Sequence, residues 1–227
     1  MPEITDQPVG SARRTLLIDL DGTLTDPKPG ITNCIGHALE RLGHPAPPAD
    51  DLVWCIGPPL LDSFRKLLPG AGEKAAREAL ALYRERFGDV GIYENTLYEG
   101  AEAFLAAMQD QHRRMFLATT KPHVYAGPIL AHFKLDGYFD GVYGSELDGV
   151  RADKRDLLGH LLAEQNLAGA QCMMIGDRIH DMAAARHVGA LGVWADWGYG
   201  DAAERAEAAP DHVCGSLGEL ADLMRDM

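Results

Sequence analysis

Two aspartates, Asp19 and Asp21, stand two positions apart directly after the apolar residues 16–18. Residues i and i+2 of an extended strand point the same way, so both carboxylates should face one pocket. Charge at the end of a buried strand is costly unless something compensates it. A hard cation such as Mg²⁺ prefers oxygen ligands and would offset the repulsion between the two groups. The pair therefore indicates a magnesium site at the edge of a sheet.

Other polar groups follow predicted strands or open predicted helices. They are Thr119 and Thr120, Lys154, Asp177 and Asp181. In open parallel sheets, ligands bind beyond the carboxyl ends of the strands. Phosphoryl transfer to an enzyme carboxylate needs one carboxylate that attacks phosphorus and a second group that handles the proton of the leaving group. It also needs cations that offset the charge of the phosphoryl oxygens, and the cluster offers each of these parts.

Each part alone has a simpler interpretation. A calcium loop that starts at Asp19 is excluded, because Leu24 and Gly30 occupy the positions where such a loop needs glycine and glutamate. Thr119 alone is typical of a strand-end hydroxyl, and Lys154 alone is typical of a solvated helix start. The prediction depends on the order of the parts, each placed at its own strand end or helix start.

Strands and helices alternate through most of the chain. Strands are predicted at residues 15–20, 114–118, 139–143, 172–175 and 192–195, with a weaker one at Val213. Helices are predicted at residues 101–109, 124–133, 154–166, 181–188 and 202–208, with a last one from Leu217. This alternation with short connections predicts an α/β fold, in which a parallel sheet carries helices on both faces.

The segment after the first strand breaks the alternation. Between residues 29 and 95 only helical patterns occur, and residues 26–30 have the composition of a linker. We therefore predict an inserted all-helical cap over residues 28–95. The core would comprise residues 13–27 and 96–227, and residues 1–12 would form a mobile tail. The two crossings between core and cap are the expected hinges.

The composition narrows the partners. The chain carries 34 acidic against 21 basic residues, a formal net charge of −13, which disfavours nucleic-acid polymers and anionic membranes. A small phosphorylated metabolite is the expected partner, for a monomer or a homodimer. The four cysteines are scattered without zinc-like spacing, and the apolar run before Asp19 is too short for a signal peptide or a membrane span. A cytoplasmic protein with buried, unpaired thiols is expected.

The four elements together resemble the motifs of the haloacid dehalogenase-like phosphohydrolases, over residues 16–199. They are Asp-x-Asp-Gly-Thr from Asp19, then Thr119, then Lys154, then Gly-Asp-x-x-x-Asp from Gly176. The resemblance implies a Rossmann-like parallel sheet and a helical cap that closes over the site. It also implies Mg²⁺ as the cofactor.

The resemblance implies a role for each carboxylate. Asp19 would be the nucleophile that forms an aspartyl-phosphate. Asp21 would protonate the leaving group and then activate water, and its backbone carbonyl would bind the metal. Asp177 would complete the metal shell, and Asp181 would be either a ligand or a residue behind the ligands.

The resemblance also implies the groups that hold the phosphoryl oxygens. Thr119 would donate its hydroxyl, and Lys154 would pair with the phosphoryl group and with Asp19. Backbone amides around Leu20, Asp21 and Thr120 would add further donors.

Asp21 also indicates the reaction class, because the dehalogenases and phosphonate hydrolases of this superfamily lack an acid at that position. Its presence favours phosphate monoesters. Residues 56–60, 118–122 and 197–200 resemble the phosphoglycolate phosphatase group, whereas residues 145–151 are closer to its 5′-nucleotidase-like branch. We therefore expect a phosphoglycolate phosphatase-like enzyme, with a nucleoside 5′-monophosphate phosphatase and a sugar phosphomutase as alternatives. A non-catalytic module would show a broken motif, and all four are intact.

Cap residues would set the substrate specificity. Arg65 and Lys66, on a predicted cap helix, are candidates to meet a substrate carboxylate or a second phosphate. The alternative for both is a solvated helix face.

Overall fold

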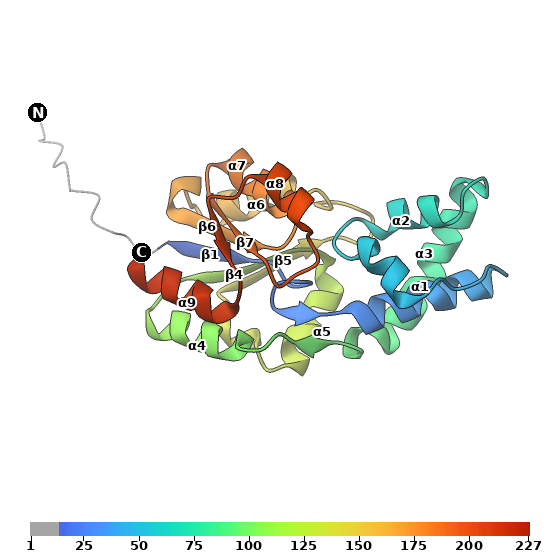
Figure 1. The fold of residues 1–227 in the computed structure, drawn as a ribbon, viewed down its shortest axis with the longest axis horizontal. Coiled ribbons are helices and arrows are strands. Elements are labelled where there is room, and N and C mark those ends of the chain that lie inside the picture. Colours follow the sequence, from blue (N-terminus) through green and yellow to red (C-terminus); the bar gives the residue numbers. More distant parts are fainter. Residues whose placement is uncertain (1–13) are drawn as a thin grey trace, which may run out of the picture.

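A computed structural model of the chain describes residues 14–227 (Figure 1). The tail predicted at residues 1–12 lies outside the described residues. No helix within the described part is long and apolar enough to cross a membrane.

A six-stranded parallel sheet forms the centre of the fold, as predicted. Its strands lie in the order β5-β4-β1-β6-β7-β8. Their bounds are Gly141–Ser145, Met115–Pro122, Thr15–Ile18, Cys172–Gly176, Leu191–Ala195 and His212–Cys214, in that order. Because β1 pairs with both β4 and β6, the residues that follow these three strands meet at one edge.

Helices cover both faces of the sheet, because successive side chains along each strand point to opposite faces. Leu16 and Ile18 pack with α4 (Ala101–Asp110), α5 (His123–His132) and α9 (Leu217–Asp226) on one face. Leu17 faces the opposite way and packs with α6 (Lys154–Glu164) and α7 (Ile179–Val188). Trp194 on β7 is fully buried beside α8 (Ala202–Ala208). The prediction of a three-layered α/β core is confirmed.

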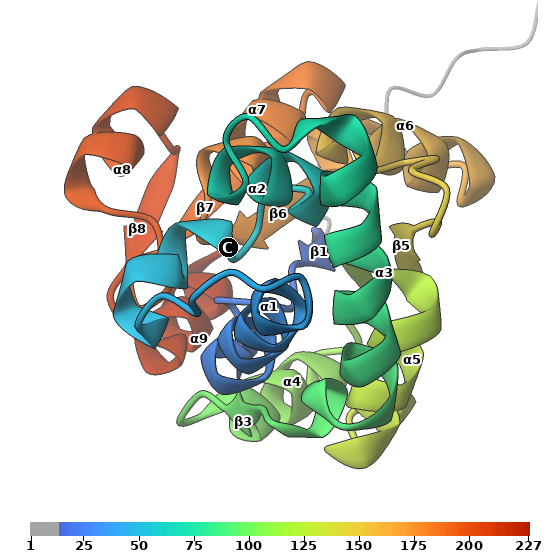
Figure 2. The ribbon, with the colours of Figure 1, turned by 90° about the vertical axis from the view of Figure 1, so that its right-hand side faces the viewer.

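The segment between residues 28 and 95 forms the cap and contains helices without a strand. Its elements are α1 (Lys28–Arg41), the 3-10 helix η1 (Ala49–Cys55), α2 (Leu60–Leu67), α3 (Gly72–Asp89) and the 3-10 helix η2 (Gly91–Tyr93). Figures 1 and 2 show these elements beyond the carboxyl ends of the strands. A short antiparallel ribbon, β2 (Thr25–Asp26) with β3 (Thr96–Leu97), joins cap and core. The sequence did not indicate this ribbon, because two residues are too few for a periodic pattern.

The interpretation of residues 26–30 as a linker is wrong. The helix α1 begins at Lys28, and Pro29 lies in its first turn, where a missing N–H leaves no bond unmade. The Asp26 carboxylate accepts a hydrogen bond from the backbone N–H of Lys28 at 2.9 Å. The chain therefore starts a helix here, and the proline does not interrupt one.

The strand predicted at 114–118 is also longer in the structure. β4 continues through Thr119 and Thr120 to Pro122, which pairs with Ser145 after an irregularity in the register. Thr119 and Thr120 therefore lie inside a strand and do not follow it. Their side chains point to opposite sides.

Gly30 marks a close approach inside the cap. A Cβ at Gly30 would lie 2.1 Å from the backbone oxygen of Gly91. The backbone N–H of Gly30 donates to the carbonyl of Glu94 at 2.9 Å. We expect Gly30→Ala to destabilise the protein by about 2 kcal/mol, because a backbone atom of η2 must move. Thermal unfolding followed by circular dichroism measures this.

Gly159→Ala is the matched control. Gly159 lies within α6, and a Cβ there would meet nothing within 4 Å. Alanine stabilises an open helical position by about 0.5–1 kcal/mol relative to glycine. Equal unfolding temperatures for the two variants would contradict the packing argument.

Candidate active site

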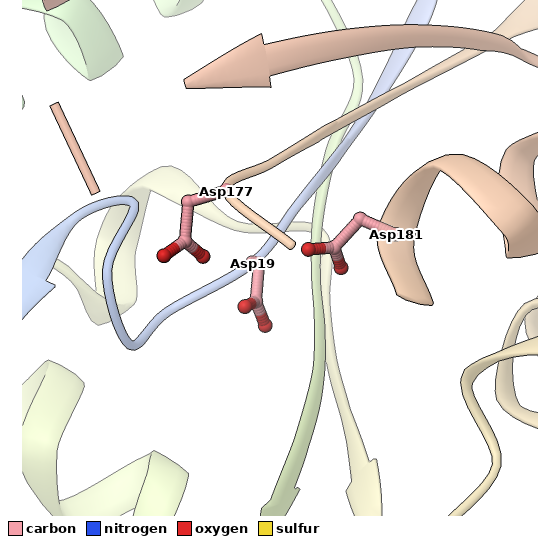
Figure 3. Close-up of side chains that lie close together, drawn as sticks. All are labelled: Asp19, Asp177 and Asp181. Atoms are coloured by element: carbon pink, nitrogen blue, oxygen red, sulfur yellow. The ribbon is translucent and has the colours of Figure 1, made fainter. Parts of the chain in front are cut away.

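Three buried carboxylates converge at the carboxyl edge of the sheet (Figure 3). Asp19 follows β1, Asp177 follows the neighbouring strand β6, and Asp181 lies in the first turn of α7. One oxygen of each lies within 4.8 Å of the others. The structure therefore brings Asp19 next to Asp177 and Asp181, which lie far along the sequence from it.

One oxygen of Asp177 is held and the other is available. The backbone N–H of Tyr199 donates to Oδ2 at 2.7 Å, while Oδ1 is buried without a hydrogen-bond partner. Gly22 adopts φ +82°, and a Cβ there would lie 2.1 Å from Asp177 Oδ2. Only a glycine therefore lets the turn after β1 approach Asp177 so closely.

The electrostatics of Asp177 fit a bound cation. Burial raises the pKa of the Asp177 carboxyl well above its usual range, and the charges of Asp181 and Asp19 raise it further. A negative charge on Asp177 is unfavourable here, because one of its oxygens is buried without a hydrogen-bond partner and two other carboxylates lie beside it. The donor set consists of oxygens only, which fits Mg²⁺.

Lys154 compensates part of this charge. Its ammonium lies 2.8 Å from Asp19 Oδ1 and 2.8 Å from Asp181 Oδ1, and its side chain is 2 % exposed. Burial acts to lower the pKa of Lys154, but the charges of Asp181 and Asp19 outweigh that effect and raise it. Lys154 therefore carries a proton throughout the physiological range.

Asp181 has both oxygens engaged. Oδ1 pairs with Lys154, and Oδ2 accepts the backbone N–H of Arg178 at 3.1 Å. Burial raises the pKa of the Asp181 carboxyl, and Lys154 offsets part of that rise.

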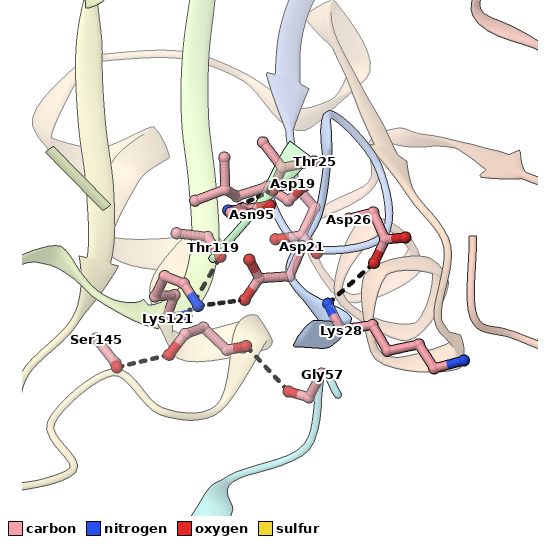
Figure 4. Close-up of polar contacts among 12 residues, drawn as sticks. Asp19, Asp21, Thr25, Asp26, Lys28, Gly57, Asn95, Thr119, Lys121 and Ser145 are labelled. Carbon is pink, nitrogen blue, oxygen red and sulfur yellow. Dashed lines mark hydrogen bonds and ion pairs between the residues drawn. The ribbon is translucent and has the colours of Figure 1, made fainter. Parts of the chain in front are cut away.

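Asp21 has a partner that the sequence analysis did not assign to it. Lys121 on β4 lies with its Nζ 2.6 Å from Asp21 Oδ2, and both side chains are largely buried (Figure 4). Burial raises the pKa of Asp21, and the charge of Lys121 opposes the rise. The signal in the sequence was the spacing of Thr119 and Lys121, because residues i and i+2 of a strand share a side.

Four carboxylates therefore share the site with two ammonium groups. They are Asp19, Asp21, Asp177 and Asp181, against Lys121 and Lys154. With all six ionised the cluster carries two negative charges. One divalent cation would bring the sum to zero, which adds to the case for Mg²⁺.

The two threonines of β4 face different partners. Thr119 is buried, and its Oγ1 accepts the backbone N–H of Lys121 at 3.2 Å, so its own hydroxyl hydrogen points elsewhere. Thr120 Oγ1 donates to the carbonyl of Gly57 in the cap at 3.2 Å. The part predicted for the backbone amides of Leu20, Asp21 and Thr120 in binding phosphate stays a prediction.

The same cap loop is held from a second side. The Arg178 guanidinium donates to the carbonyl of Ile56 and pairs with Glu204 at 2.9 Å. The sequence alone did not indicate this contact, because Arg178 and its partner in the cap lie more than a hundred positions apart. With Thr120 and Arg178 both attached to the loop at residues 56–57, the cap rests closed against the core.

Arg65 and Lys66 make their contacts elsewhere. Arg65 pairs with Asp62 and Glu73 and is 44 % exposed. Lys66 lies over the Trp54 ring, with Nζ 5.4 Å from the ring centroid. These contacts belong to the cap surface and do not reach the carboxylate cluster, so the predicted role of both residues in specificity gains no support from them.

The chain is similar to several known proteins. A family model described as haloacid dehalogenase-like hydrolase matches residues 16–195. A 5′-nucleotidase of Pseudomonas aeruginosa is 42% identical over 92% of this chain and 94% of its own. A tyrosine-protein kinase, PtkA, of Mycobacterium tuberculosis is 36% identical over 85% of this chain and 65% of its own. A phosphoglycolate phosphatase of Cupriavidus necator is 31% identical over 92% of both chains.

A solved structure agrees with these matches. The crystal structure of a predicted phosphatase from Clostridium acetobutylicum superposes with a TM-score of 0.90 at 33% identity, over 96% of this chain and 100% of its own. The chain belongs to the haloacid dehalogenase-like hydrolase family. Within it, the chain is an enzyme of the phosphoric monoester hydrolase class.

The raised pKa of Asp177 leads to a test of metal binding. The pKa of this carboxyl is 3.8 in the unfolded chain and higher in the folded protein. The folded protein therefore loses stability as the pH rises above 3.8. We expect saturating Mg²⁺ to raise the unfolding temperature by about 5–10 °C at pH 7.5 and by less at pH 5.5, where protons compete for the ligands. Differential scanning calorimetry measures both shifts.

Variants separate this site from general ion effects. Asp177→Asn should unfold at a higher temperature than the wild type without metal and should lose the magnesium shift. Asp156→Asn, on the exposed face of α6, is the control and should keep it. A magnesium shift that survives in Asp177→Asn would place the cation elsewhere.

Proposed function

We propose that this protein is a Mg²⁺-dependent phosphatase that hydrolyses a small phosphate monoester through an aspartyl-phosphate on Asp19. The observation that carries the proposal is the setting of Asp19. One of its oxygens is held by Lys154 at 2.8 Å, beside a carboxylate with a free buried oxygen at Asp177. A carboxylate oriented in this way can attack phosphorus.

In the first half-reaction Asp19 attacks phosphorus while the bond to the leaving oxygen breaks. Lys154 and the free hydroxyl hydrogen of Thr119 bind the phosphoryl oxygens, whose charge is greatest in the transition state. Asp21 gives its proton to the leaving oxygen. The raised pKa of Asp21 supports this role, because burial favours its protonated form.

In the second half-reaction water attacks the phosphorus of the aspartyl-phosphate. Asp21, now ionised, takes the proton of that water, and the Asp19 carboxylate leaves. Phosphate is released and both aspartates return to their starting states. The closed cap keeps bulk water away from the intermediate until this step.

Asp19, Asp177 and the backbone carbonyl of Asp21 would hold Mg²⁺, with Asp181 behind the ligands because both its oxygens are engaged. The ion supplies positive charge next to the transferring phosphoryl group. Lys154 links Asp181 to Asp19, so the residue behind the ligands also fixes the nucleophile.

Two substrate classes have specific support. Phosphoglycolate is supported by the sequence features at residues 56–60 and 118–122 and by the relative from Cupriavidus necator. Nucleoside 5′-monophosphates are supported by the higher identity to the relative from Pseudomonas aeruginosa. A sugar phosphomutase, the remaining alternative, would convert its substrate with little net release of phosphate.

We also propose that the enzyme acts in the cytoplasm, on a diffusible metabolite. The four buried free thiols are in keeping with a reducing compartment. The net charge of −13 disfavours polymeric and membrane-bound anions. Whether the enzyme is a monomer or a homodimer stays a prediction without support from these features.

Asp19→Asn tests the covalent mechanism. We expect kcat to fall by at least about a thousandfold, because an amide cannot attack phosphorus at a useful rate. Phosphate release from a monoester measures activity, and acid quenching followed by mass spectrometry detects the phosphorylated chain. Asp156→Asn is the control, and a fully active Asp19→Asn would contradict the assignment of Asp19.

A substrate panel distinguishes the classes. With Mg²⁺, kcat/KM should be highest for phosphoglycolate or for a nucleoside 5′-monophosphate, with the Asp19→Asn protein as the blank. Product analysis by NMR should show free phosphate and alcohol in equal amounts. An isomerised sugar phosphate without free phosphate would establish the mutase instead.

A further inference from the structure

We propose that Lys121 is a positioning residue, which holds Asp21 in its working orientation and links that orientation to closure of the cap. The inference rests on the proposed function, in which Asp21 protonates the leaving oxygen. Lys121 lies between the two parts of the molecule, with Asp21 of the core on one side and Phe87 of the cap on the other.

The backbone fixes where Lys121 points. Lys121 lies two residues beyond Thr119 on β4, so its side chain emerges on the side of the strand that faces the site. Its backbone N–H donates to Thr119 Oγ1, which ties the two residues together. The side chain is buried, and within residues 14–227 the one carboxylate within 4 Å of its ammonium is that of Asp21.

The pair leaves one oxygen of Asp21 available. Lys121 engages Oδ2 at 2.6 Å, while Oδ1 is buried and has no hydrogen-bond partner. A carboxyl group that is anchored by one oxygen has a defined rotamer, and the second oxygen then has a defined direction. Oδ1 is therefore the atom that carries the proton to the leaving oxygen.

The cap supplies the other half of the environment of Lys121. Its Nζ lies 4.6 Å from the centroid of the Phe87 ring, on helix α3. Phe87 stacks on Tyr83 at 5.1 Å and meets Tyr125 of the core edge-on at 5.3 Å. An ammonium over an aromatic face is stabilised most when water is excluded, so this contact depends on the cap being closed.

These contacts give Lys121 a specific effect on the reaction. An alkoxide leaves poorly without a proton, whereas p-nitrophenolate leaves without one. If Lys121 orients the acid, removal of Lys121 should slow the hydrolysis of alkyl esters and leave the hydrolysis of the nitrophenyl ester nearly unchanged. A lysine needed only for folding or for overall charge would affect both esters alike.

Lys121→Met tests the proposal with two esters of similar size, p-nitrobenzyl phosphate and p-nitrophenyl phosphate. AMP and phosphoglycolate serve as further alkyl esters. The quantity to compare is kcat/KM, because it reports only the steps up to departure of the leaving group. We expect a fall of about a hundredfold for the alkyl esters, the lower range for a proton-transfer contribution, and of at most a few-fold for the nitrophenyl ester.

Phe87→Leu tests the contact between Lys121 and the cap. It should lower kcat/KM for the alkyl esters about fivefold, the effect of one lost cation–π contact, and leave the nitrophenyl ester nearly unchanged. Phe64→Leu is the matched control. Phe64 is also a buried cap aromatic and meets Tyr83 edge-on at 6.2 Å, but it is not in contact with Lys121.

The outcomes separate this inference from the proposed function. Asp21→Asn should show the same preference for the nitrophenyl ester as Lys121→Met. Suppose that Asp21→Asn shows this preference, while in Lys121→Met kcat/KM falls equally for both esters or for neither. The inference is then wrong and the proposed function stands. If Lys121→Met does not fold, as judged by circular dichroism, equal behaviour of Phe87→Leu and Phe64→Leu overturns the inference. A fully active Asp19→Asn would contradict the function itself.

Discussion

Repulsion among buried carboxylates is the constraint on which the rest of the structure depends. Two unit charges 4 Å apart interact by about 4 kcal/mol at an effective dielectric constant of 20. Asp19, Asp177 and Asp181 are buried, and one carboxylate oxygen of each lies within 4.8 Å of the others. Lys154 offsets part of the repulsion by contacting Asp19 and Asp181 at once. A divalent cation would offset the remaining excess of negative charge at this edge of the sheet.

The order of the strands follows from this constraint. β1 lies at the centre of the sheet between β4 and β6, so Asp19 is flanked by Thr119 and Asp177. Lys154 reaches the same edge from the start of α6. A parallel sheet is suited to this because all of its strands end on the same side. The chain enters the cap through β2, shortly after β1, and the cap therefore begins near Asp19.

Local patterns were sufficient to predict the fold class and the strands that carry Asp19 and Asp177 at their ends. Alternation of strands and helices indicated the parallel sheet, and Asp19, Lys154 and Asp177 follow directly from apolar runs or helix starts. The same patterns could not predict the contacts of Lys121 with Asp21 or of Arg178 with the cap. Those contacts join segments that are remote in the sequence, and they form only when the cap packs against the core. The length of β4 was missed for a related reason, because its last residues pair with β5 after an irregularity.

The two aspartates that share one side of the first motif differ through their partners. Asp19 is held by an ammonium from the core and lies beside Asp177 and Asp181. Asp21 is buried beneath the cap, and Lys121, which pairs with it, lies against a cap aromatic. The local sequence gives both the same residue type. In the proposed function, the segments that contact them, β4 and α6 in the core and α3 in the cap, would make Asp19 the nucleophile and Asp21 the acid. A change in the cap would then alter proton transfer without touching the carboxylate that attacks phosphorus.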